Sequence, residues 1–178
     1  MSPSEYAFAG AAFLESDRGR LLALSSAPSH LRQILEATPD LEQEYVRLFL
    51  NPAGSPCVPW QSAHEGERKL MGEAHTSALE WYARYGAVPA AGNNPADHVG
   101  LLLMFYAQLM ASGAHADELQ RFSATHLSWI PEFGASVAAQ SRIAFYRELG
   151  RWVQGLHPTG SDLCKCCGAS VASGSSDS

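Results

Sequence analysis

Residues 94–106 read Asn-Pro-Ala-Asp-His-Val-Gly-Leu-Leu-Leu-Met-Phe-Tyr, a polar start followed by an apolar run. Asn94 is a good N-cap and Pro95 suits a first helical position, so the sequence predicts a helix that begins here. Asp97 then falls in the first turn, where its charge suits the free N–H groups and the positive end of the helix dipole. His98 shares a helical stripe with Leu102, Phe105 and Leu109. We therefore expect a buried helix with a carboxylate and an imidazole at its open end.

The rest of the chain carries the same helical signature. Apolar residues recur at three- and four-residue steps, which predicts helices over 5–16, 21–24, 29–37, 41–50, 65–86, 95–112, 116–128 and 137–156. Pro131 is expected to mark a break before the last of these. No segment alternates as a strand does, and there is no internal repeat or coiled-coil heptad. The predicted fold class is all-α, a single compact multi-helix globular domain over residues 1–160. Residues 161–178 are rich in Gly, Ser and Cys, and we expect a disordered tail there.

Composition narrows the classes of function. The chain has 178 residues, of which 46% are hydrophobic and 17% charged, and its formal net charge is −6. A negative charge argues against a nucleic-acid or anionic-membrane binder and favours a cationic partner. The N-terminus lacks the basic and apolar regions of a secretory signal, and no apolar run is long enough to span a membrane. The sequence thus predicts a cytoplasmic protein without membrane insertion.

Two further stretches combine aromatic residues with prolines. The first reads Tyr45-Val-Arg-Leu48-Phe49 and continues, through a proline-stiffened loop, to Pro59-Trp60-Gln61-Ser62. The second reads His126-Leu127-Ser-Trp129-Ile-Pro131-Glu-Phe133. We expect the stiff loop to hold Trp60 in one place.

These stretches, together with Pro95-Ala-Asp97-His98, resemble the TorD/DmsD family of redox-enzyme maturation chaperones, which includes the NarJ-like proteins. The family shows Tyr-x-x-Leu-Phe, a loop with Pro-Trp-Glu-Ser, Pro-x-Asp-His and His-Leu-x-x-Trp-x-Pro-x-Phe in this order. Order and spacing agree over residues 40–135. Gln61 departs from the pattern, because an acid is common there, and so does the Cys-x-Cys-Cys sequence of the tail.

The resemblance implies an all-helical chaperone, not an enzyme and with no cofactor of its own. Its partner would be the twin-arginine signal peptide of a molybdenum-cofactor oxidoreductase subunit, held while the precursor folds and receives its cofactor before export. Such a leader has two adjacent guanidinium groups followed by an apolar run, so its receptor needs acidic groups beside an apolar groove. The resemblance implicates Asp97, His98, Pro95 and Trp60 in signal-peptide binding, with Tyr45 as a further candidate. Both a monomer and a domain-swapped dimer fit an all-helical domain with long loops.

Each candidate residue also has a purely structural interpretation. Asp97 suits a helix start, and His98 suits a core histidine hydrogen-bonded to a loop carbonyl. Trp60 and Tyr45 suit packing positions, and for Trp129 packing is the preferred role. The acidic run of Glu36, Asp40, Glu42 and Glu44 is expected to form a solvated face, which would also steer a cationic leader.

The alternative function is a metal-dependent hydrolase or a soft-metal-binding protein. The candidate ligands are His64, His75, His98 and His126, or the thiolates of Cys164, Cys166 and Cys167. The histidines lack the His-x-x-x-His or Glu-x-x-His spacing of a helical metal site, and no glycine-rich nucleotide loop is present. We therefore favour the chaperone, and for the cysteines an incidental tail, with no metal assigned.

Overall fold

The structure is a computed structural model that describes residues 2–51, 53–65, 71–88 and 94–156. These residues form a helical assembly without a strand, as predicted, and the all-α fold class is confirmed. The helices in chain order are α1 (Pro3–Leu14), α2 (Arg18–Ala23), α3 (Ser29–Glu36), α4 (Leu41–Tyr45), the π-helix η1 (Val46–Leu50), α5 (Gln61–His64), α6 (Glu73–Arg84), α7 (Val99–Ala111), α8 (Ala116–His126), α9 (Ile130–Gln140) and α10 (Ala144–Gln154). The predicted tail, 161–178, lies outside the described residues.

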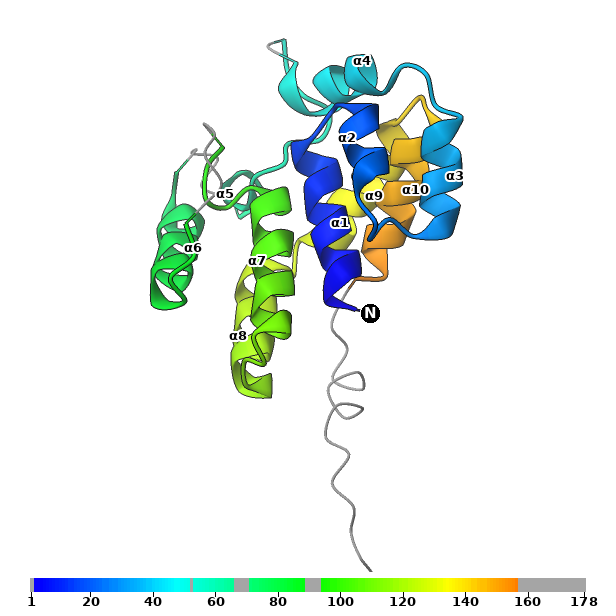
Figure 1. Ribbon diagram of the computed structural model, residues 1–178. Coiled ribbons are helices and arrows are strands. Elements are labelled where there is room, and N and C mark those ends of the chain that lie inside the picture. Colours follow the sequence, from blue (N-terminus) through cyan, green and yellow to red (C-terminus); the bar gives the residue numbers. More distant parts are fainter. Residues whose placement is uncertain (1, 52, 66–70, 89–93, 157–178) are drawn as a thin grey trace, which may run out of the picture.

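The centre of the fold is the packing of α1 along α7 (Figure 1). The two helices approach closely because each has a glycine at the crossing. A Cβ atom on Gly10 would lie 2.6 Å from the backbone oxygen of Gly100, and one on Gly100 would lie 2.7 Å from that of Gly10. Helices α9 and α10 cross in the same way at Gly134 and Gly150. Helices α5, α6 and α8 flank α7 on one side, and the remaining helices lie on the side of α1 (Figure 1).

An aromatic cluster fills the core beside α1. Phe49 packs edge-on against Phe13, Tyr45 and Tyr146, with ring centroids 5.2–5.9 Å apart. Full burial of one such ring stabilises a fold by roughly 1.5–3 kcal/mol. The π-helical turn of η1 directs Leu48 and Phe49 inward.

The acidic run was predicted to form a solvated face, and for Glu44 this prediction was wrong. Its carboxylate is buried and accepts hydrogen bonds from Arg47 and from the backbone N–H of Arg142, in the turn between α9 and α10. Burial acts to raise the pKa of Glu44, but these hydrogen bonds outweigh it and lower the pKa. Glu44 therefore joins two distant parts of the chain, whereas Glu36, Asp40 and Glu42 are exposed.

Several predicted helix limits were wrong. The helix expected over 95–112 begins at Val99, because residues 95–98 form a turn and His98, not Asn94, is the N-cap. The helix expected over 137–156 is two helices, since Ser141 is extended and its hydroxyl caps the turn by accepting from the N–H of Ile143. Pro131 was expected to mark a break before the last helix. It lies instead in the first turn of α9, where its fixed backbone angle suits a helix start.

The helix expected over 65–86 is also shorter than predicted, because α6 begins only at Glu73 and ends at Arg84.

In the described part of the chain, no helix is long and apolar enough to cross a membrane.

Candidate functional site

Two of the motifs are joined by a short antiparallel bridge between Trp60 and His98. The N–H of Val99 donates to the carbonyl of Pro59 at 2.8 Å, and the N–H of Gln61 donates to the carbonyl of Asp97 at 3.1 Å. Pro59 lacks an N–H group and accepts only, so the pairing cannot extend as a ladder beyond it. The bridge places the proline-rich loop against the start of α7.

The Asp97 side chain reinforces this bridge. It is fully buried, and its Oδ2 accepts the backbone N–H of Ser62 at 2.9 Å. Its other oxygen, Oδ1, is buried without a hydrogen-bond partner. His75 Nδ1 lies 3.8 Å from Oδ1, but the same nitrogen accepts the N–H of Ala96 at 2.9 Å and so has no proton to give. Asp97 was predicted to lie in the first turn of the helix. Instead it precedes α7 and anchors the Trp60 loop.

His98 is the N-cap of α7. Its Nδ1 accepts the N–H of Gly100 at 3.1 Å, which requires the neutral ring with its proton on Nε2. Burial lowers the pKa of His98 to about 4, although the charge of Asp97 acts in the opposite direction. The imidazole is thus a buried helix cap.

A second polar network lies beside the bridge and was not predicted. Gln61 donates from Nε2 to the carbonyl of Thr125 at 2.7 Å and to Glu65 at 2.6 Å. Its Oε1 can only accept, so His126 Nδ1 carries the proton in their 2.9 Å contact. His126 Nε2 then accepts from the hydroxyl of Ser77 at 3.2 Å. The network ties α5, α6 and α8 together, and burial lowers the pKa of His126 to about 4 despite the opposing charge of Asp97.

Trp60 is half-buried and lies at the bridge. Its Nε1 is buried without a hydrogen-bond partner, as is the hydroxyl oxygen of Ser62. Pro95 is buried just before the bridge. Three buried polar atoms without hydrogen-bond partners thus lie on two neighbouring segments. They are Nε1 of Trp60, Oγ of Ser62 and Oδ1 of Asp97.

Tyr45 lies elsewhere, in the aromatic cluster. Its hydroxyl donates to the carbonyl of Phe13 at 3.0 Å, and burial raises its pKa to about 12. Four of the five predicted binding residues therefore lie together, and Tyr45 is not one of them. Their role in binding stays a prediction.

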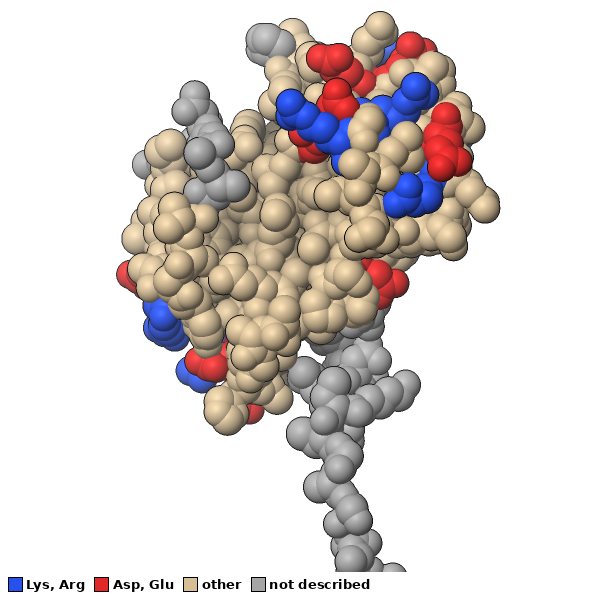
Figure 2. Space-filling model, viewed as in Figure 1, with Lys and Arg blue, Asp and Glu red and all other residues tan. Residues whose placement is uncertain are grey.

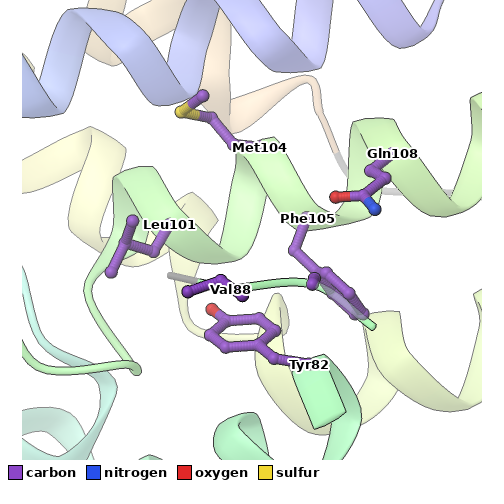
Figure 3. A pocket seen from close by; sticks show the side chains of 7 residues that line it. Tyr82, Val88, Leu101, Met104, Phe105 and Gln108 are labelled. Carbon is purple, nitrogen blue, oxygen red and sulfur yellow. The ribbon is translucent and has the colours of Figure 1, made fainter. Parts of the chain in front are cut away.

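An apolar pocket of about 150 Å³ follows α7 beyond the bridge (Figure 3). Its lining comes from α6, α7 and the chain after α6: Tyr82, Ala87, Val88, Leu101, Met104, Phe105 and Gln108. The Tyr82 hydroxyl donates to the carbonyl of Ala96 at 2.7 Å, which connects the pocket wall to the segment that carries Asp97. Phe105 of the predicted stripe lines the pocket, whereas Leu102 is fully buried and is not part of the lining.

The surface over α7 and α1 is mostly uncharged in Figure 2, and charged side chains gather over α2–α4. Met104 and Val88 are exposed at the pocket, with 40% and 87% of their surface accessible. An exposed apolar surface bordered by polar residues is typical of a site for an apolar segment.

The four histidines proposed as metal ligands lie apart or have other partners. His64 stacks on Trp129, and His98 and His126 hold the contacts given above. Among the described residues, no three His, Cys, Asp or Glu side chains come together as a metal site would require. Cys164, Cys166 and Cys167 lie outside the part of the chain that the structure describes.

The arrangement of helices is that of a redox-enzyme maturation protein. A candidate redox enzyme maturation protein from Archaeoglobus fulgidus superposes with a TM-score of 0.67 over 86% of this chain and 92% of its own, at 24% identity. The family model of the nitrate reductase delta subunit matches residues 21–135, more than half of the chain. The chain therefore belongs to the nitrate reductase delta subunit family, and the resemblance inferred from the motifs is confirmed.

Curated relatives include Tat proofreading chaperones DmsD from Salmonella typhi and Salmonella paratyphi A. Each is 32% identical over 114 residues, which are 62% of this chain and 55% of the relative. The match thus spans little more than half the length of these chaperones.

Proposed function

We propose that the protein is a cytoplasmic chaperone that binds the twin-arginine signal peptide of a molybdenum-cofactor oxidoreductase subunit. In this role it assists folding and cofactor insertion before the precursor is exported. Membership of the family and similarity to proteins named Tat proofreading chaperones support the proposal. The net charge of −6 suits a leader that carries two arginines.

The observation that carries the proposal is the apolar pocket that adjoins the Trp60–His98 bridge. A leader's apolar run needs a groove that removes it from water, at roughly 25 cal/mol per Å² before association and ordering costs. The pocket along α7 offers such a surface, and Met104 at its exposed edge is the kind of adaptable side chain that fits varied apolar partners.

In this proposal Asp97 does not contact the leader but holds the residues around the binding site in place. Its carboxylate is buried and holds the N–H of Ser62, so it fixes the position of the neighbouring Trp60, which in this role would contact the leader. His98 likewise fixes the first turn of α7 through the N–H of Gly100.

The test compares two exposed apolar residues on neighbouring helices. Met104 lines the pocket with 40% of its surface exposed, and Leu79 on α6 is 41% exposed but does not line it. Met104→Gln should weaken binding of a synthetic twin-arginine leader about tenfold in titration calorimetry, because it places a polar amide against the apolar run. Leu79→Gln should leave the affinity unchanged. Equal effects of both substitutions, or no binding to the wild type, would refute the assignment.

A further inference from the structure

A second, smaller pocket lies between α5 and α6. It has a volume of about 70 Å³ and is lined by Ser62, Glu65, Glu73 and Ala74. This space exceeds that of one water molecule and suits the end of a single side chain. Ser62, which lines this pocket, is held through its N–H by the carboxylate of Asp97.

The hydroxyl of Ser62 is the first sign of a missing ligand. Ser62 is only 3% exposed, and its Oγ is buried without a hydrogen-bond partner. Buried polar atoms are almost always paired, because an unpaired one loses its hydrogen bonds to water without replacement. A ligand in the pocket would supply the missing partner.

The two glutamates define the chemistry of this ligand. Glu65 uses Oε1 to accept from Gln61, which leaves Oε2 available. Glu73 makes no hydrogen bond or ion pair within the described residues, and its place in the first turn of α6 suits its charge without explaining Ser62. Two carboxylates around a hydroxyl oxygen present acceptors from several directions, and a planar guanidinium with five N–H donors matches such a set better than a point charge does.

We propose that the pocket formed by Ser62, Glu65 and Glu73 binds the guanidinium group of one arginine of the leader, an inference that rests on the proposed function. The spacing agrees with a peptide that continues into the apolar pocket. Ala74 lines the small pocket and Tyr82 the apolar one, eight residues further along α6. This separation is about 12 Å at 1.5 Å per residue, which about four residues of extended peptide cover.

The experiment is a thermodynamic cycle between protein and peptide. Each arginine of a synthetic leader is replaced in turn by citrulline, which keeps the shape of the side chain but not its charge. Binding of the three peptides is measured by calorimetry to the wild type, to Glu73→Gln and to Ser62→Ala. The matched control is Glu80→Gln, because Glu80 is an exposed glutamate of α6 that does not line the pocket.

One of the two citrulline peptides should bind the wild type and Glu80→Gln about tenfold more weakly than the parent leader. The same replacement should cost less than about threefold in Glu73→Gln, and Ser62→Ala should reduce its effect as well. If the leader binds but both citrulline replacements cost the same in all four proteins, the pocket does not hold an arginine, and the proposed function stands. If the leader does not bind the wild type, the proposed function and this inference both fail.

Discussion

The Oδ2 atom of Asp97 lies 2.9 Å from the backbone nitrogen of Ser62, thirty-five residues earlier in the chain. The backbone carbonyl of Asp97 accepts from the N–H of Gln61, so one buried residue holds two successive N–H groups in the first turn of α5, directly after Trp60. The loop that presents Trp60 therefore depends on the start of α7 for its position.

Asp97→Ala should lower the free energy of unfolding by about 1–3 kcal/mol, because it leaves the N–H of Ser62 buried without a partner, and it should weaken leader binding because the Trp60 segment loses its anchor. Asp97→Asn keeps an acceptor for this N–H and should recover most of the affinity. Calorimetry with the leader, alongside circular dichroism to confirm the helical content, measures both variants. If Asn is as damaging as Ala, the charge of Asp97 matters and its positioning role is insufficient.

The buried histidines predict a dependence of stability on pH. The pKa of His98 and of His126 is about 4 in the folded protein, below the value of about 6.5 for an unfolded chain. Between these values the unfolded state binds more protons than the folded state, so folding stability falls as the pH drops from 6.5 towards 4. Each histidine contributes up to about 3 kcal/mol to this loss, which urea denaturation at pH 7, 5.5 and 4.5 should reveal.

His98→Asn isolates one of the two histidines. Asn is a good N-cap and keeps an acceptor for the N–H of Gly100, but it does not titrate. The variant should show a shallower loss of stability between pH 6.5 and 4 than the wild type. An unchanged slope would mean that His98 is not held neutral by the fold.

The close approach of α1 and α7 predicts a steric effect. Gly10→Ala places a Cβ atom 2.6 Å from the backbone oxygen of Gly100, which cannot move aside as a side chain would. We expect the free energy of unfolding to fall by about 1–3 kcal/mol. Gly155→Ala is the control, because the nearest atom to its added Cβ is 3.4 Å away, and it should be nearly neutral in thermal denaturation.

The sequence predicted the helical fold and the candidate residues of the bridge because both depend on local patterns. The spacing of apolar residues in α7 and the prolines around Trp60 can each be recognised within one short stretch of sequence. The start of α7 was misplaced because the N–H of Val99, which a helix beginning at Asn94 would use, donates instead to Pro59. Only the tertiary pairing determines this choice.

The network of Gln61 and His126 was missed for the same reason. The two residues are sixty-five positions apart, and nothing local indicates that their side chains meet. Both residues belong to the sequence motifs that the chain shares with the chaperone family. The motifs do not indicate that the two side chains form a hydrogen bond. Glu44 was assigned to a solvated face because its neighbours are acidic, whereas its partner, Arg142, is ninety-eight positions away.

The most direct test of the central claim compares a twin-arginine leader with the same peptide carrying two lysines, at low and at high salt. Lysine keeps the charge but lacks the planar guanidinium that carboxylates and hydroxyls bind at several points. The arginine leader should bind more tightly, and much of its affinity should survive high salt if its apolar run is buried in the pocket along α7. Equal affinities that disappear together on adding salt would contradict this claim, since they would indicate only a nonspecific attraction to an acidic protein.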